Sequence, residues 1–396
     1  MSIRLGLHFH GGDTDLAPVT GRSWRTFTVL DMDRGLIPHI LARIPRQEWP
    51  NVLIHVRQMA ELDPHQWGVE HYDPSAPIVK GRELARIAWE LYSVWPMVTW
   101  VFTGLNEPEI ESGVDTKEEF QHCARYCMDH AYAFHEEYRW LSSDNGSLGR
   151  QVLLGGRPSS PGHNEDGPDT NDWGYGYAIL KEVWGLEYRD LPLIHIIVAH
   201  LYEPTPAGET AYWYGLRIFR PVGYKDSVEG VDAGDPGGLY WLARELNLPI
   251  LISEANLTNV GDLDAIARIK AWLGHIVELD VDDRVVGIHW FVLDTPDPRF
   301  HTMKLILNEN LLNVWATWVA PEKETTMPEF GEAMARLADR IRSAGYEVTA
   351  LTGETQVGGG LVRQVVTIDG EPRVFEYQAG AGDAWVVVRA VIVPKG

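Results

Sequence analysis

Short runs of apolar residues alternate with longer amphipathic segments through most of the chain. We count eight runs rich in Val, Ile and Leu, at residues 5–10, 26–31, 52–57, 98–103, 152–156, 193–199, 250–253 and 285–291. Runs this short and this continuously apolar are typical of strands that are buried on both faces of a parallel sheet. The pattern therefore predicts eight parallel strands.

The segments between these runs carry apolar residues at helical spacing. We expect helices at 34–44, 81–95, 116–141, 174–185, 235–247 and 262–279, with a last one at 327–344, and the first crossover, 12–24, has the weakest helical pattern. Eight strands joined by helical crossovers fit an α/β fold, the closed (β/α)8 TIM barrel, in which functional residues lie at the carboxyl ends of the strands. We assign residues 1–345 to this barrel, with a doubly wound open sheet as the alternative.

Residues 346–396 have a different pattern, with strand-like runs in place of helical segments. Asp369-Gly370, between two of these runs, is a hairpin turn signal. A β appendage this short can hardly bury a core of its own, so we expect it to pack on the barrel rather than to fold independently. A carbohydrate-binding role for the appendage is an open alternative.

Composition and charge narrow the possible partners. The chain has 396 residues, 45% of them hydrophobic, which is enough for one large core. Its net charge of -22, from 56 acidic and 34 basic residues, argues against a nucleic acid or an anionic membrane as a partner. No apolar run reaches the roughly 18 residues of a membrane span, and no basic start leads into an apolar stretch, so we expect a cytoplasmic protein. The oligomeric state stays open.

Two glutamates stand where two of the predicted strands end. Asn106-Glu107-Pro108 follows the run 98–103, and Glu254 follows the run 250–253. Because the carboxyl ends of all barrel strands meet at one end of the barrel, carboxylates at the ends of the fourth and seventh strands can project into one pocket. Cleavage of a glycosidic bond needs this pair, since one carboxylic acid protonates the departing oxygen while an ionised carboxylate attacks the anomeric carbon. The sequence therefore predicts a glycosidase site.

These motifs resemble those of clan A glycoside hydrolases, and the chain looks most like family 5 and its relatives. The resemblance implies retention of configuration by double displacement, with Glu107 as acid/base, Glu254 as nucleophile and Asn106 as a donor to the sugar 2-hydroxyl. His200-Leu201-Tyr202 resembles the family's His-x-Tyr, in which the tyrosine holds the nucleophile, and Trp290 resembles the tryptophan that floors the subsite beside the scissile bond. The implied substrate is a carbohydrate, and we expect a β-linked glucan, a mannan or a short glycoside. The resemblance implies no cofactor.

Further polar and aromatic residues are candidates for the same site, at the mouth of the barrel where the strands end. Arg57 ends the third run, where a guanidinium would favour the ionised form of a neighbouring carboxylate. Family 5 usually has its arginine earlier and a histidine on strand three, so Arg57 departs from the pattern, and it could instead bridge Asp31 or another structural acid. The remaining candidates are His8 and His10 on the first strand, Asp31 after the second, and Trp173 in the loop after the fifth.

Two other functional classes remain open at this point. His8 and His10 lie on one face of the first strand and, with His200 and Asp294, could bind the metal ion of a metal-dependent barrel hydrolase. The sequence has no His-Glu-x-x-His motif and no phosphate-binding glycine motif. A barrel that binds glycans without cleaving them, or that serves as a structural module, is the second class. Cys123 and Cys127 are one helical turn apart, which predicts reduced thiols rather than a long-range disulfide.

Overall fold

The structure is a computed structural model of the whole chain. It describes residues 3–9, 16–58, 75–104, 117–143, 147–159, 173–201, 216–219, 222, 237–257, 259–294, 298–319, 348–357, 361–368, 371–379 and 385–392. The chain divides into two compact units, Met1–Pro321 and Glu322–Gly396.

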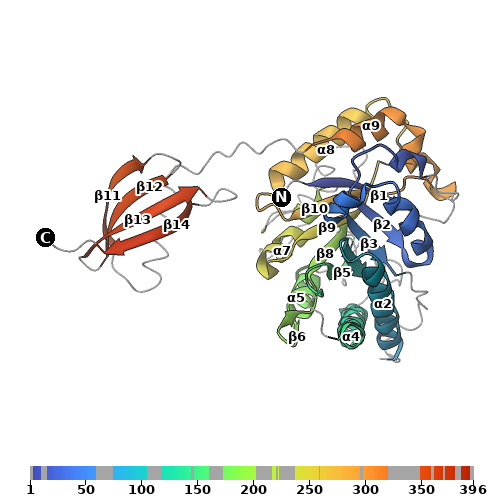
Figure 1. The fold of residues 1–396 in the computed structure, drawn as a ribbon, viewed down its shortest axis with the longest axis horizontal. Helices are drawn as coiled ribbons and strands as arrows, with labels where there is room; N and C mark the ends of the chain where they lie inside the picture. Colours follow the sequence, from blue (N-terminus) through green and yellow to red (C-terminus); the bar gives the residue numbers. More distant parts are fainter. Residues whose placement is uncertain are drawn as a thin grey trace. The chain divides into compact units, whose positions relative to one another are not determined.

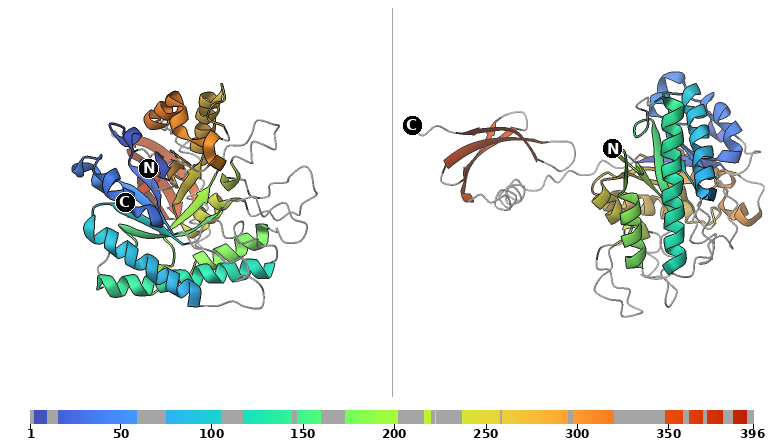
Figure 2. Two further views of the ribbon diagram at one scale, coloured as in Figure 1. Left: turned by 90° about the vertical axis from the view of Figure 1, so that its right-hand side faces the viewer. Right: turned by 90° about the horizontal axis from the view of Figure 1, so that it is seen from below.

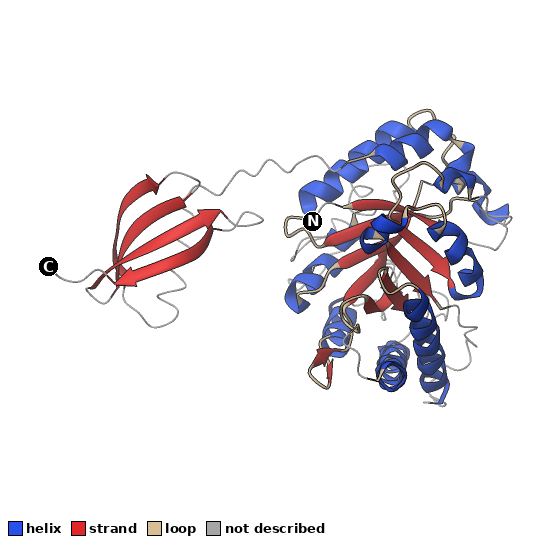
Figure 3. Ribbon diagram, in the orientation of Figure 1, coloured by secondary structure: helices blue, strands red, loops and turns tan. Residues whose placement is uncertain are grey.

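Eight parallel strands of the first unit close into a barrel (Figures 1 and 3). Each strand pairs with its neighbours in chain order, and β1 pairs with β10 to close the ring, with Leu7 opposite Trp290. This confirms the predicted (β/α)8 barrel, and the open sheet is excluded. The strands are β1 (Arg4–Phe9), β2 (Thr26–Leu30), β3 (Leu53–Arg57), β4 (Thr99–Thr103), β5 (Val152–Ser159), β8 (Ile196–His200), β9 (Ile250–Ala255) and β10 (Val285–Trp290).

Helices cover the outside of the barrel, as Figure 3 shows. They are α1 (Ile37–Leu41), α2 (Ser75–Val94), α4 (Lys117–Ser142), α5 (Trp173–Trp184), α7 (Leu239–Leu246), α8 (Ala265–Leu279) and α9 (Glu309–Thr317). The first six match predicted helices, and α9 lies in a segment where we predicted no helix. The described part of the first crossover holds only a 3-10 turn, Ala17–Val19, and the helix predicted at 327–344 lies outside the described residues. Among the described helices, none combines the length and the apolar character needed to cross a membrane.

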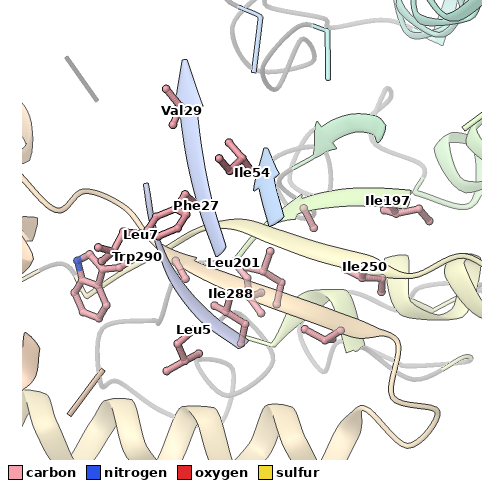
Figure 4. Close-up of a cluster of buried hydrophobic side chains, with 14 of the residues drawn as sticks. Leu5, Leu7, Phe27, Val29, Ile54, Ile197, Leu201, Ile250, Ile288 and Trp290 are labelled. Carbon is pink, nitrogen blue, oxygen red and sulfur yellow. The ribbon is translucent and has the colours of Figure 1, made fainter. Parts of the chain in front are cut away.

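The core has an outer and an inner part. The outer part lies between strands and helices and includes Leu7, Phe27, Ile54 and Trp290, which Figure 4 shows on β1, β2, β3 and β10. The inner part is a smaller apolar cluster made by Leu53, Val101, Ile196, Val198 and Leu251. Because side chains alternate along a strand, the outer and inner sets take alternate positions.

The barrel interior changes character along its length. The apolar inner cluster ends before the carboxyl ends of the strands, where the inward positions are taken by polar side chains. On β3 the inward residues are in turn Leu53, His55 and Arg57, all of them buried. TIM barrels usually fill their interior with bulky branched residues, so this change marks the functional end of the barrel.

Helices α2 and α4 pack closely, side by side, on one flank of the barrel (Figure 2). Gly81 of α2 makes this approach possible, because a β-carbon there would overlap the carbonyl oxygen of His130 and lie 3.0 Å from the Ala133 β-carbon. We expect Gly81→Ala to lower the free energy of unfolding by about 2 kcal/mol, as overpacking does. Urea denaturation followed by circular dichroism measures this change.

A glycine in α8 provides the matched control. Nothing lies within 4 Å of a β-carbon built at Gly274. Gly274→Ala should therefore raise the free energy of unfolding by about 0.5–1 kcal/mol, since alanine has the higher helix propensity and restricts the unfolded chain. Equal effects of the two substitutions would contradict a specific role for Gly81 in helix packing.

The second unit contains one antiparallel sheet of four strands, in the order β11 (Val348–Val357), β12 (Leu361–Ile368), β13 (Glu371–Ala379) and β14 (Trp385–Ile392). Ile368 of β12 lies opposite Glu371 of β13. This pairing is the one that the predicted turn at Asp369-Gly370 requires, although the two turn residues lie outside the described residues. Packing of this appendage on the barrel stays a prediction.

Candidate functional site

The site is built around Glu254, near the carboxyl end of β9, the seventh strand of the barrel. Regular alternation would turn Glu254 away from the barrel, because it lies three residues after the inward Leu251. However, β9 shifts register against both of its neighbours close to Glu254. A bulge of this kind adds one residue and redirects the side chains that follow. Glu254 therefore points into the barrel mouth, while Ala255 returns to the outer core.

Three basic side chains surround the Glu254 carboxylate. The Arg57 guanidinium pairs through Nη1 with Oε1 of Glu254. His8 on β1 places Nδ1 3.7 Å from the same oxygen, and His200 on β8 places Nδ1 3.5 Å from Oε2. All four residues are 0–3% exposed, so the carboxylate interacts with them in a medium of low dielectric constant.

The structure thus brings together four of the residues predicted for the site, Glu254, Arg57, His8 and His200. Arg57 pairs with Glu254, and the Asp31 carboxylate accepts a bond from the backbone N–H of Met32 at 2.8 Å. Asn106, Glu107, His10 and Tyr202 lie outside the described residues, as does the side chain of Trp173.

Trp290 does not occupy the place predicted for it. The residue is 0% exposed, donates its indole N–H to the Met303 carbonyl oxygen at 3.1 Å and packs edge-on against Trp315 with ring centroids 5.0 Å apart. A side chain enclosed in this way cannot stack on a sugar ring, so its role as a subsite floor is corrected to core packing. The next residue, Phe291, instead lies against the His8 ring, beside Glu254.

The aromatic ring of Phe291 lies next to His8, one of the side chains around the Glu254 carboxylate. Its ring meets the His8 ring edge-on, with centroids 4.9 Å apart, and meets Phe300 in the same manner at 5.0 Å. Because His8 in turn lies beside Glu254, Phe291 belongs to the same wall of the site. Alternation along β10 could have indicated this, since His289 faces inward and Trp290 outward.

Directly below Arg57 and Glu254 the interior holds polar residues that the sequence analysis did not single out. His55 and His289 are both fully buried and both bond to the Thr28 hydroxyl. Burial lowers the pKa of His289 to about 3. Burial first, and then neighbouring His289, Arg57 and His200, hold the pKa of His55 well below its usual value. Both imidazoles are therefore neutral at neutral pH.

The chain that leaves β4 toward Asn106 and Glu107 is fixed by contacts with α4. A β-carbon at Gly104 would lie 2.9 Å from the His130 ring, whose Nε2 is 3.1 Å from Oε1 of Gln58. The Gln58 backbone N–H donates to the Thr103 carbonyl oxygen at 2.9 Å. These contacts tie the ends of β3 and β4 to α4.

The metal-dependent alternative loses one of its proposed ligands. Asp294 pairs with Lys304, with 3.1 Å between its carboxylate and the ammonium group. Within the described part of the chain, no group of three or more His, Cys, Asp or Glu side chains has the arrangement of a metal site. Both cysteines lie in α4, neither is in a disulfide, and Cys123 is buried.

Arg57→Met is expected to destabilise the protein by about 3–5 kcal/mol, because it leaves the buried Glu254 carboxylate without its guanidinium partner. The double variant Arg57→Met/Glu254→Gln removes both charges and should recover most of this loss. Urea denaturation at neutral pH measures both variants. If Arg57→Met has the same free energy of unfolding as the wild type, the Arg57–Glu254 ion pair does not stabilise the fold.

No protein-family model matches the chain, and no curated protein matches its sequence. Similar solved structures include a GH5 xyloglucan-specific endo-β-1,4-glucanase from a metagenomic library, in complex with cellotriose, at 14% identity and a TM-score of 0.44 over 79% of this chain and 96% of that one. Thermotoga maritima Cel5A in complex with cellobiose has 13% identity and a TM-score of 0.42 over the same shares of the two chains. A GH128 endo-β-1,3-glucanase from Amycolatopsis mediterranei, in complex with laminaripentaose, has 12% identity and a TM-score of 0.33 over 75% and 91%. At these values the similarity concerns the barrel architecture, which the strand order already shows.

Proposed function

We propose that this protein is a retaining glycoside hydrolase that cleaves β-glycosidic bonds by double displacement. The observation that carries the proposal is the Glu254 carboxylate, which is turned into the barrel mouth by a bulge and set against Arg57, His8 and His200. A guanidinium and two imidazoles around one carboxylate favour its ionised form, which is the form that a glycosidase nucleophile needs. A purely structural glutamate has no need of a bulge that directs it to the functional end of the barrel.

In the proposed mechanism Glu254 attacks the anomeric carbon while Glu107 donates a proton to the departing glycosidic oxygen. Glu107 then acts as a base on a water molecule, which attacks the anomeric carbon and releases Glu254. Asn106 donates to the sugar 2-hydroxyl and Tyr202 holds the nucleophile; these roles, like that of Glu107, come from the resemblance to clan A motifs. Retention predicts about 5–5.5 Å between the two carboxyl groups.

We further propose that Phe291 takes the place in the site that the sequence suggested for Trp290. Its ring lies against His8 on the wall that adjoins Glu254, where an aromatic face can pack on the C–H side of a sugar. The motif resemblance favours a β-linked glucan, mannan or short glycoside as the substrate.

The deciding experiment is hydrolysis of a panel of activated aryl β-glycosides, with the configuration of the first-formed sugar read by proton NMR. Retention of configuration supports the proposal, and inversion overturns it. Azide should partly rescue Glu107→Ala with an activated substrate and yield a β-glycosyl azide, because a small anion can replace the base-activated water. A wild type that binds glycans but is as inert as Glu107→Gln and Glu254→Gln would establish the binding-module alternative instead.

A further inference from the structure

Five polar side chains form a continuous hydrogen-bonded chain across the barrel interior, one layer below Glu254. Thr26 Oγ1 is 2.6 Å from Nε2 of His289, whose Nδ1 is 2.6 Å from Oγ1 of Thr28. Thr28 Oγ1 is 3.1 Å from Nδ1 of His55, whose Nε2 is 2.8 Å from Oγ1 of Thr103. The five residues come from β2, β3, β4 and β10 and are 0–1% exposed. We call them the interior relay.

The interior relay couples the tautomers of its two imidazoles. Each ring has both nitrogens on a hydroxyl group, and a neutral imidazole has one donor and one acceptor. The single hydroxyl hydrogen of Thr28 can be donated to only one of the two rings, so at least one ring donates its N–H to Thr28. Thr28 therefore links the tautomer of His55 to that of His289.

The relay is placed to act on the site above it. His55 and Arg57 are two residues apart on β3, so their side chains point into the barrel one above the other. Thr103, which ends the relay, is the partner of Arg57 in the pairing of β3 with β4. The charged and titratable groups near His55 are Arg57 on its own strand, His289 on β10 and His200 on β8. A positive charge on His55 would repel the guanidinium that holds Glu254.

The surrounding backbone makes room for this layer. A β-carbon at Gly6 of β1 would overlap the carbonyl oxygen of Thr26 and lie 2.8 Å from the His289 ring. Bulky aliphatic residues, the usual filling of such a barrel, would occupy this space without desolvating five polar groups. A fully bonded buried network instead fixes side chains in one arrangement.

We propose that His55 is a positioning residue of this site, and that Thr28 holds it in one neutral tautomer so that Arg57 stays directed at Glu254. This inference rests on the proposed function only for its effect on turnover. The proposed link from Thr28 through His55 to the Arg57–Glu254 pair does not depend on which reaction takes place at Glu254.

The test compares Thr28→Val, which removes the shared hydroxyl at nearly constant volume, with Thr28→Ser, which restores it. Thr99→Val, the same change at the start of β4, is the matched control. Two NMR readouts need no substrate: the side-chain 15N shifts of His55, which report its tautomer, and the pH titration of the Glu254 side-chain 13C signal. The kinetic readout is kcat and KM on an activated aryl β-glycoside.

In Thr28→Val we expect mixed tautomers of His55 and a titration midpoint of Glu254 raised by about one pH unit, because the guanidinium is no longer fixed against it. We expect kcat to fall by about 100-fold with KM changed by less than about 3-fold, the signature of a misplaced reacting group. Thr28→Ser and Thr99→Val should match the wild type. If Thr28→Val is too unstable to purify, His55→Gln gives the same readouts of Glu254 and turnover.

A Thr28→Val protein that melts at a lower temperature but keeps the wild-type Glu254 titration and kcat overturns the proposal, because the relay is then only structural. If the wild type hydrolyses no glycoside, the proposed function fails, but the Glu254 titration still decides this inference. A shifted midpoint in Thr28→Val supports the positioning role, and an unchanged midpoint refutes it.

Discussion

Glu254→Gln is expected to abolish glycosidase turnover, lowering kcat by about 10⁴-fold or more, while the barrel still folds. A neutral side-chain amide is a far weaker nucleophile than a carboxylate, so the covalent intermediate forms very slowly. The amide oxygen can still accept a hydrogen bond from Arg57, which keeps a partner for the buried guanidinium. The loss of activity should therefore greatly exceed the loss of stability.

Initial rates on an activated aryl β-glycoside measure this effect, with circular dichroism and urea denaturation as checks on folding. Glu278→Gln is the matched control, because Glu278 is an exposed residue on α8, remote from the mouth, and its loss should leave kcat unchanged. A Glu254→Gln protein that retains a tenth or more of the wild-type kcat would show that Glu254 is not the nucleophile.

The barrel could be predicted because its strands are buried on both faces and so appear as uninterrupted apolar runs. All eight predicted runs became strands, and their spacing left room for helical crossovers. Helix α9 was missed although its pattern is amphipathic, because it has only nine residues and follows the last strand of the barrel, where no crossover to a further strand is needed. One local signal could have found it: Asn308 caps the helix, its side-chain oxygen accepting the backbone N–H of Leu311 at 3.0 Å.

The site was harder to predict, because its geometry depends on contacts between strands that are far apart in the sequence. The inward direction of Glu254 arises from a change of register with two neighbouring strands, which the alternation within β9 does not reveal. The Trp290 prediction failed for a related reason. The family resemblance favours a tryptophan at the end of the strand, but the inward position of His289 directs Trp290 to the helix layer and leaves the mouth to Phe291.

The interior relay could not be predicted from the sequence. Thr26, Thr28 and His55 stand inside apolar runs, where isolated polar residues are commonly satisfied core groups. Only the closed barrel places His289 within bonding distance of two threonines that precede it by more than 250 residues. Arg57 was identified as a candidate because it ends its strand, a position that periodicity does locate.

Acidification is expected to destabilise the barrel steeply between about pH 6.5 and pH 4, because several buried histidines must be neutral in the fold. Burial lowers the pKa of His130 and of His195 to about 4 and that of His289 to about 3, and the pKa of His55 is also well below its usual value. In the unfolded chain each imidazole has a pKa of about 6.5. Between these values the unfolded state binds more protons than the folded state, so the free energy of unfolding falls as the pH falls.

Each such histidine should contribute a slope of about 1.4 kcal/mol per pH unit within this window. His130→Gln removes one titrating group but keeps an N–H that can donate to Gln58. At about pH 8, where the imidazoles are neutral, the variant should be less stable than the wild type by its lost packing against Gly104. As the pH falls this difference should shrink and then reverse, because only the wild type must keep His130 uncharged. Urea denaturation at a series of pH values measures the two slopes, and parallel curves would show that His130 gains no proton on unfolding.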